Sequence, residues 1–339
     1  MRIEARTVRK LRSLAIIAAA GIGWGTVFGM IRYGVTQNGI LLGMANGLAI
    51  SLMVWVSELF IFQGPLRRLN LTALLGIRVL IYASLITMVL TTMAAALGES
   101  APYRGWARLF QDAGFWPTFG FSSIAALLMS LFLAMDRIVG RGVLINFIAG
   151  HYRNPVEEDR AFMFLDLAGS TQIAEEIGSL RFYSLLKDFF YDLTEPIMEH
   201  HGHIYKYVGD EIIVAWRMRP GRSNADPVHC FFDICQVMDS RKDWYQAKYG
   251  LTLHFRAGIH SGSVITGEMG DYRQEIVFLG DVVNTTARLV EEAKVLNHRL
   301  LISGDYLSRA ELPGHLTAEP MGSIKLRGKL HELIVYGVD

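Results

Sequence analysis

Two aspartates that follow apolar segments could hold metal ions. Asp166 ends the apolar run 162–165, and Asp210 follows a glycine in a pattern typical of a tight turn between two strands. Carboxylates are ligands of the kind that Mg²⁺ prefers, and a sheet that brought the two together would suit a two-metal site for phosphoryl transfer. Either residue alone could instead be structural, Asp166 as a helix cap and Asp210 as a turn residue.

Small and polar residues around these aspartates extend the chemistry. Gly169, Ser170 and Thr171 open a predicted helix just after Asp166, and the free amides of a helix N-terminus are a natural phosphate cradle. Further along the chain, Asn284 and Arg288 stand four residues apart, so a helix would place both on one face. Such a pair suits orientation of a ribose and stabilisation of charge at a reacting phosphate, although a solvated polar helix face is the alternative.

The three motifs, in this order, resemble the catalytic domain of class III adenylate/guanylate cyclases over roughly residues 160–338. The resemblance implies that Asp166, Leu167 and Asp210 hold two Mg²⁺ or Mn²⁺ ions per site. One ion would activate the ribose 3′-hydroxyl and the other would stabilise the departing pyrophosphate. The expected product from ATP is 3′,5′-cyclic AMP.

The resemblance also assigns the substrate contacts. Gly169, Ser170 and Thr171 would bind phosphate, Asn284 the ribose, and Arg288 the reacting phosphate. Arg327 would contact the terminal phosphates, a role for which Lys325 and Lys329 compete. These sets meet across a dimer in this family, so the resemblance implies a homodimer with two equivalent shared sites.

Base selection is where the sequence departs from the family pattern. Lys206, four residues before Asp210, matches the lysine of adenine-selective members, whereas guanylate cyclases usually carry Glu there. The second base contact, commonly Asp or Thr seven residues before the Asn, falls on Val277, which cannot accept a hydrogen bond from its side chain. We predict ATP as substrate. A guanylate or loosely selective cyclase, or a catalytically silent sensor or scaffold, are the alternatives.

The pattern of strands and helices agrees with this resemblance. Strands are expected at 162–166, 204–208, 212–216, 254–260 and 263–267, helices at 172–200, 226–248 and 282–296, and a closing hairpin at 324–338. This order predicts an α+β, ferredoxin-like β-α-β-β-α-β sandwich with helices on one face of the sheet. The cyclase family has that fold.

The N-terminal part of the chain has a different composition. Residues 1–150 hold 13 Lys and Arg against five Asp and Glu, and residues 151–339 hold 20 against 27. Four apolar runs each approach the ~20 residues that a helix needs to cross a bilayer. They lie at about 13–31, 40–62, 75–97 and 117–139. We predict a four-span helical transmembrane region at 1–139, a coupling linker at 140–159 and the catalytic domain at 160–339.

Charged residues around these runs predict their orientation. Lys and Arg are concentrated before the first run, between the second and third, and after the fourth. The positive-inside rule then places both termini and the catalytic domain in the cytoplasm, with the spans in an inner or plasma membrane. No basic cluster indicates a nucleic-acid partner. Glu58 and Arg78 fall at the cytoplasmic ends of the second and third runs, where we predict an ion pair or interfacial snorkelling rather than a transport site.

Overall fold

The computed structural model describes residues 2–58, 71–96, 115–139, 150, 152–272, 274–324 and 332–339. The chain divides into two compact units, Met1–Leu144 and Ile145–Asp339. Most of the predicted linker at 140–159 lies outside the described residues, and the first strand of the second unit already begins at Val156.

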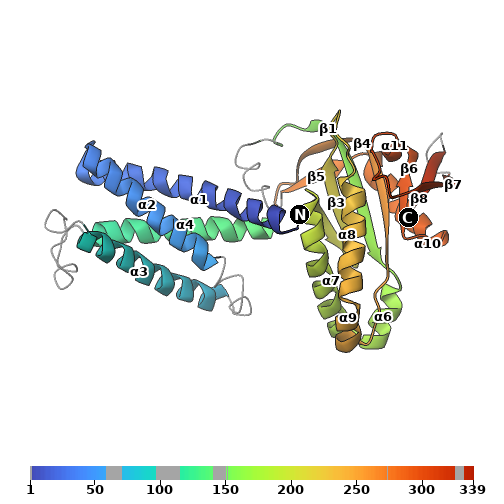
Figure 1. Ribbon diagram of the computed structural model, residues 1–339, viewed down its shortest axis with the longest axis horizontal. Coiled ribbons are helices and arrows are strands. Elements are labelled where there is room, and N and C mark those ends of the chain that lie inside the picture. The colour runs from blue at the N-terminus through green and yellow to red at the C-terminus, as the bar shows by residue number, and fades with distance from the viewer. Residues whose placement is uncertain are drawn as a thin grey trace. The chain divides into compact units, whose positions relative to one another are not determined.

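The described residues of the first unit form four long helices (Figure 1). They are α1 (Arg2–Tyr33), α2 (Gln37–Ser57), α3 (Leu71–Ala96) and α4 (Phe115–Val139). Each contains a stretch of 18 to 21 residues that is long and apolar enough to cross a membrane. All four helices overlap the predicted apolar runs, so the four apolar helices are confirmed.

Glycines allow α1 and α2 to pack closely. Gly21 and Gly25 of α1 face Gly43 and Gly47 of α2, and a Cβ added at any of these four would collide with backbone or side-chain atoms of the other helix. Gly23, on the other side of α1, has nothing near the corresponding position. Small residues at an interface let backbones approach in lipid, where the hydrophobic effect does not drive helices together. The α1–α2 hairpin therefore depends on glycine at the contact positions.

Glu58 joins three helices of this unit. Its Oε1 accepts hydrogen bonds from the hydroxyls of Tyr82 on α3 and Ser130 on α4, both at 2.9 Å. Arg78 of α3 lies 3.3 Å from the same oxygen. Glu58 and Arg78 are each 4% exposed. The predicted ion pair is confirmed, and its surroundings satisfy the carboxylate as a buried charge requires.

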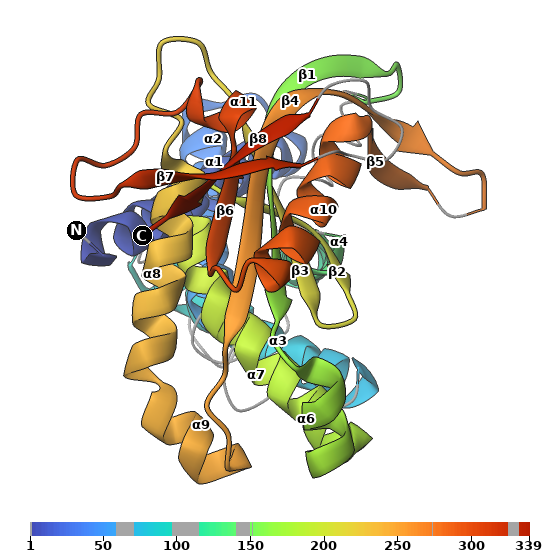
Figure 2. The ribbon, with the colours of Figure 1, turned by 90° about the vertical axis from the view of Figure 1, so that its right-hand side faces the viewer.

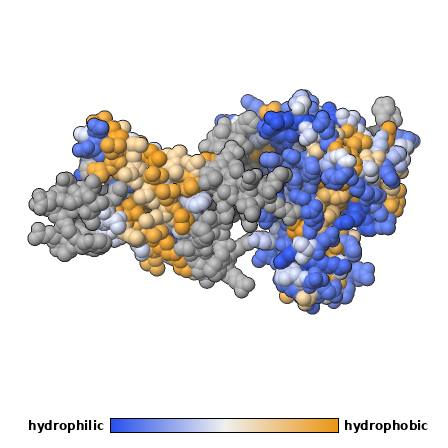
Figure 3. Space-filling model, in the orientation of Figure 1, coloured by the Kyte–Doolittle hydropathy of each residue, from blue (hydrophilic) through white to orange (hydrophobic). Residues whose placement is uncertain are grey.

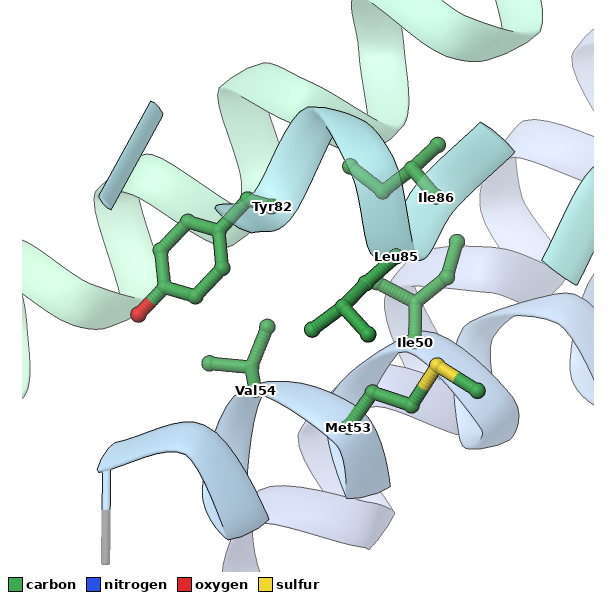
Figure 4. Close-up of a pocket in the computed structure, with 6 residues that line it drawn as sticks. All are labelled: Ile50, Met53, Val54, Tyr82, Leu85 and Ile86. Carbon is green, nitrogen blue, oxygen red and sulfur yellow. The ribbon is translucent and has the colours of Figure 1, made fainter. Parts of the chain in front are cut away.

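Apolar side chains surround this polar cluster and cover the outside of the helices. Figure 4 shows Val54 and Met53 of α2 facing Leu85 and Ile86 of α3 next to the Tyr82 ring. The outward surface of α1–α4 is mostly apolar (Figure 3). Its large exposed side chains include Ile16, Trp24, Val27, Leu41, Leu80, Met88, Trp116, Ile124 and Leu128.

The second unit is built on an eight-stranded sheet with the order β2-β3-β1-β4-β6-β8-β7, and β5 pairs with β4 (Figures 1 and 2). The strands are β1 (Val156–Leu167), β2 (His203–Val208), β3 (Glu211–Arg217), β4 (Phe255–Met269), β5 (Glu275–Leu279), β6 (Leu300–Ser303), β7 (Ala318–Ile324) and β8 (Leu333–Val338). The helices are α6 (Ser170–Ile177), α7 (Ser179–Glu199), α8 (Asp226–Ser240), α9 (Lys242–Tyr249), α10 (Asp281–Val295) and α11 (Gly304–Leu307). The β2-β3-β1-β4 core is antiparallel throughout and has the predicted ferredoxin-like connectivity.

Helices cover both faces of the sheet, rather than one face as predicted. Alternate residues of a strand point to opposite faces. Met163 of β1 belongs to the core that α7 and α8 cover, whereas Phe162 packs with β5 and α10. Gly258 of β4 lets α10 approach, since a Cβ there would collide with Leu289. The amphipathic pattern of α10 did not by itself reveal which face it would cover.

Other boundaries differ from the sequence expectations for identifiable reasons. Gly178, at φ 80°, divides the predicted helix 172–200 into α6 and α7. The two strands expected at 254–260 and 263–267 are one continuous strand, β4. Strands β5 and β6 were not predicted, and β6 is only four residues long.

Candidate active site

The fold brings the two candidate metal-binding aspartates together. Asp166 lies near the end of β1, opposite Glu211 of the neighbouring antiparallel strand β3. Asp210 stands one residue before that strand, in a turn where Gly209 adopts φ 62°. A left-handed conformation costs glycine little, which explains the residue type at this position. Asp210 precedes the strand residue that pairs with Asp166, so its side chain lies close enough for its charge to act on Asp166.

Mutual repulsion and burial dominate the electrostatics of this pair. Partial burial, the close Asp210 side chain as an acceptor for protonated Asp166, and the negative charge of Asp210 raise the pKa of Asp166 to about 6, against a smaller opposing effect of Lys294. Burial and the charges of Asp166 and Asp210, with a contribution from Glu291, raise the pKa of Glu211 to about 7. Two carboxylates held this close disfavour joint ionisation, and a divalent cation would relieve that cost.

The donor set at this position fits hard divalent cations. Two carboxylates converge, and carboxylate oxygens are what Mg²⁺ and Mn²⁺ favour. The Leu167 side chain is buried in the core, so this residue could contribute only its backbone oxygen. Among the described residues no group of three or more His, Cys, Asp and Glu side chains forms a metal site. The aspartate pair would therefore share its ions with backbone and substrate oxygens, as nucleotide sites commonly do.

The predicted phosphate cradle lies directly after Asp166. Helix α6 begins at Ser170, and its N-cap Gly169 has a left-handed φ of 72°. The first backbone bond of the helix runs from the Ile173 amide to the Gly169 carbonyl, at 3.0 Å. The amides of Ser170 and Thr171 precede that bond and have no partner within the helix. These donors, four and five residues after Asp166, are the type of group that binds phosphate.

Asn284 and Arg288 lie on the outward side of α10. Their neighbours Val282, Thr286 and Leu289 are buried against the sheet, whereas Asn284 is exposed and Arg288 half-buried. Within the described part of the chain, no hydrogen bond or ion pair links either residue to Asp166 or Asp210.

Helix geometry explains this separation. The α10 residue whose charge acts on Asp166 is Lys294, in the last turn of the helix. At 1.5 Å per residue, Arg288 stands about 9 Å and Asn284 about 15 Å earlier along the helix axis. Within one chain, Asn284 and Arg288 thus lie earlier along α10 than the residue whose charge acts on Asp166.

The predicted base-contact residues lie on β2 and β5. Lys206 of β2 forms an ion pair with Glu275 of β5, with 3.0 Å between Nζ and Oε2. Val277 is half-buried on β5, two residues from Glu275 and therefore on the same side of the strand. Sequence reasoning did not identify Glu275, although its two-residue spacing from Val277 was a usable signal. Arg327, Lys325 and Lys329 lie outside the described residues.

The sheet order, the aspartate pair and the polar face of α10 together define a class III nucleotide cyclase. Residues 154–338 match the family model for the adenylate and guanylate cyclase catalytic domain. This match covers more than half of the chain, and the chain belongs to that family.

Individual relatives agree with this assignment. The chain is 36% identical over 203 residues to adenylate cyclase 2 of Rhizobium meliloti (strain 1021), covering 60% of this chain and 56% of the relative. It is 26% identical over 183 residues to an adenylate cyclase of Anabaena cylindrica, covering 52% of this chain and 36% of the relative. The matched region thus spans about half or less of these relatives' own length.

A solved structure supports the fold. The structure of a bacterial light-regulated adenylyl cyclase superposes with a TM-score of 0.56 at 19% identity, covering 65% of this chain and 64% of the other. At this level of identity the likeness bears on the fold alone.

Proposed function

We propose that this protein is a membrane-bound adenylate cyclase that converts ATP to 3′,5′-cyclic AMP and pyrophosphate. The observation that carries the proposal is that the pairing of β1 with β3 brings Asp166 and Asp210 close together, which would form a place for divalent cations. Burial and the Asp210 charge raise the pKa of Asp166 to about 6, as expected for two such carboxylates. Lys206, a hydrogen-bond donor at the position that resembles the adenine-selecting lysine, favours ATP. The named adenylate cyclases among the relatives point the same way.

In this mechanism the chain mainly holds and orients the substrate. Asp166, Asp210 and the backbone oxygen of Leu167 would hold two Mg²⁺ or Mn²⁺ ions. When bound, these ions supply Lewis-acid activation of the 3′-hydroxyl and charge neutralisation at the leaving pyrophosphate. The 3′-hydroxyl gives up its proton to solvent, and its oxygen forms a bond to the α-phosphorus while the bond from that phosphorus to the bridging oxygen of the β-phosphate breaks and pyrophosphate leaves. The amides of Ser170 and Thr171 would bind phosphate oxygens.

Asn284 and Arg288 would act from the second chain of a homodimer. Asn284 would hold the ribose so that its 3′-oxygen points at the α-phosphate, and Arg288 would stabilise the charge that develops there. The separation of these residues from the aspartate pair within one chain supports a site shared between two chains. A symmetric dimer would contain two such sites.

The membrane location follows from the first unit. Four helices of spanning length, with an apolar outer surface and a charged pair inside, fit a lipid environment. Lys and Arg are concentrated before the first apolar run, between the second and third runs and after the fourth, which by the positive-inside rule would place both termini and the catalytic domain in the cytoplasm. This region would belong to the inner or plasma membrane.

A less selective enzyme is the second candidate, and Val277 favours it. A valine side chain offers no acceptor to the adenine amino group, and discrimination weakens where a buried polar contact is missing. The test is cyclic nucleotide production by the full-length protein with ATP and with GTP, in Mg²⁺ and in Mn²⁺, beside Asp210→Ala. We expect cyclic AMP that disappears in the variant. Equal cyclic GMP would establish loose selectivity, and no product under any condition would favour a silent scaffold.

A further inference from the structure

An ion pair between two distant strands lies where the base of the nucleotide is expected. Lys206 and Glu275 are 69 residues apart in sequence, and their side chains meet at 3.0 Å. Neither side chain is buried, at 47% and 33% exposure, so a ligand can reach both. Exposed pairs of this kind add little stability, which leaves room for a role in binding.

The aromatic packing of β5 explains how the pair forms. Phe278 of β5 packs against Phe162 of β1 and Tyr205 of β2, with ring centroids 5.3 and 4.8 Å apart. This places β5 over the sheet face that α10 also covers, next to the β2 residue that precedes Lys206. Glu275 and Val277 point to the same side of β5, so Glu275 stands beside the position expected to contact the base.

The same segment leads directly to the other substrate-binding residues. Strand β5 ends at Leu279, Gly280 follows, and α10 begins at Asp281. Asn284 therefore follows Glu275 by nine residues in one continuous strand-and-helix segment. The segment that would bring Asn284 to the ribose therefore also carries Glu275.

We propose that Glu275, together with Lys206, recognises the adenine base, and that Val277 only forms part of the pocket wall. This inference rests on the proposed cyclase function. The Lys206 ammonium donates to adenine N1, and a Glu275 carboxylate oxygen accepts from the 6-amino group. The pair thus supplies the acceptor that Val277 lacks.

The geometry favours adenine over guanine at this pair. Guanine presents two neighbouring donors, N1–H and the 2-amino group, and binds best to both oxygens of one carboxylate. Lys206 already contacts Oε2 of Glu275. Adenine requires a single carboxylate acceptor beside a donor, which is what a lysine–glutamate pair offers.

The test measures base recognition separately from turnover. 3′-Deoxy nucleotides lack the attacking hydroxyl and cannot be cyclised, so their binding to the full-length protein, in Mg²⁺, is read without reaction. The comparison uses 3′-deoxy-ATP, 3′-deoxy-GTP and the 3′-deoxy triphosphate of purine riboside, which differs from 3′-deoxy-ATP only in lacking the 6-amino group. The proteins are the wild type, Glu275→Ala, Glu275→Gln and a control, Asp188→Ala.

Asp188 makes the control a close match. It pairs with Lys248 at 2.6 Å, with side-chain exposures of 29% and 47%, on helices α7 and α9. Asp188→Ala removes an acid from a similar lysine pair outside the base pocket. The control protein should discriminate between the nucleotides as the wild type does.

The proposal predicts that the wild type binds 3′-deoxy-ATP about tenfold or more tightly than the purine analogue, the ratio expected for one charge-assisted hydrogen bond. Glu275→Ala should reduce that ratio to about one, and Glu275→Gln, which keeps an acceptor, should retain most of it. If Glu275→Ala still prefers 3′-deoxy-ATP over the purine analogue as the wild type does, the proposal is overturned. It is also overturned if Glu275→Ala loses only the binding of 3′-deoxy-GTP. If the wild type still binds 3′-deoxy-ATP more tightly than the purine analogue but forms no cyclic nucleotide, the proposed function is refuted and the base contact is supported. If the protein binds none of the nucleotides, both proposals are overturned.

Discussion

The two units of this protein place charge in opposite ways. In the helical unit the Glu58–Arg78 pair is buried, and large apolar side chains cover the outside. In the catalytic unit the core is apolar, and most ion pairs, such as Lys206–Glu275 and Lys248–Asp188, lie near the surface, with the buried Arg160–Glu158 pair as an exception. The apolar outside of the helical unit is what a lipid environment requires, and the polar outside of the catalytic unit is what water requires.

Buried and exposed ion pairs should also differ in how much they contribute to folding stability. A buried ion pair with additional hydrogen-bond donors is costly to break, because the remaining charge stays buried. An exposed pair contributes about 0–1 kcal/mol. Charged residues of the helical unit should therefore matter most for folding, and those of the catalytic unit for activity.

The largest effect is expected at Glu58. Glu58→Leu removes the carboxylate that Arg78, Tyr82 and Ser130 all contact, which should destabilise the protein by about 3–5 kcal/mol. The double variant Glu58→Leu/Arg78→Leu should be less destabilised than Glu58→Leu alone, because no charge remains inside. Thermal unfolding and the yield of monodisperse protein in detergent measure both. A double variant that is worse than the single one would contradict the pairing account.

The next effect concerns catalysis and leaves stability unchanged. Arg288→Ala should lower kcat by about 10²–10³-fold, as loss of a transition-state donor does, with little change in unfolding temperature. The control is Arg222→Ala, an exposed arginine in the loop before α8. Rates of cyclic nucleotide formation and thermal unfolding are compared for the two variants. A drop of less than about threefold for Arg288→Ala would remove this residue from the catalytic group.

A smaller effect is expected at the α1–α2 contact. Gly43→Leu should destabilise the hairpin by about 1–3 kcal/mol, the usual cost of overpacking, because the added atoms meet the backbone of α1. Gly23→Leu places the same atoms where nothing lies within 4 Å and should have little effect. Unfolding in detergent measures both variants. Equal loss in the two would mean that helix propensity or lipid exposure, and not close packing, governs this hairpin.

The smallest effect concerns the aspartate pair without metal. Asp166 and Glu211 have raised pKa values, about 6 and about 7, so the folded state binds more protons than the unfolded chain between about pH 4 and 7. Metal-free stability of the catalytic unit should therefore fall as pH rises through this window. Asp210→Asn removes one repelling charge and should raise the metal-free melting temperature at pH 8 by about 2–4 °C, the shift that ~1 kcal/mol produces.

Differential scanning fluorimetry in chelator measures this effect. Adding Mg²⁺ or Mn²⁺ should stabilise the wild type more than Asp210→Asn, since the cation relieves the same repulsion. A lower metal-free melting temperature for the variant at pH 8 would contradict the repulsion between the carboxylates.

Local patterns predicted a large part of this fold. The length and the apolar composition of the four runs identified the helices, because a helix that crosses a bilayer must be both long enough and apolar enough. Two opposite charges inside apolar runs predicted the Glu58–Arg78 pair, because a lone charge there is costly. The strand-turn-strand pattern around Asp210 predicted the β2–β3 hairpin.

Features that depend on contacts between distant segments could not be predicted from local sequence patterns. The contact between Lys206 and Glu275 depends on β5 lying over the sheet, where Phe278 packs edge-to-face against Phe162. No local sequence pattern encodes this packing. The placement of α10 on the second face depends on the small residue at Gly258. The raised pKa of Asp166 depends on burial, a property of the assembled sheet.

The most direct test of the account asks whether two chains share the active site. Asp166→Ala and Arg288→Ala are each prepared alone and as a heterodimer isolated through two different tags, and cyclic AMP formation from ATP is measured beside the wild type. The account predicts inactive single variants and a heterodimer with about half of the wild-type activity, because one of its two symmetric sites keeps both residue sets. A confirmed heterodimer without recovered activity would show that the aspartates and Arg288 do not meet across the dimer.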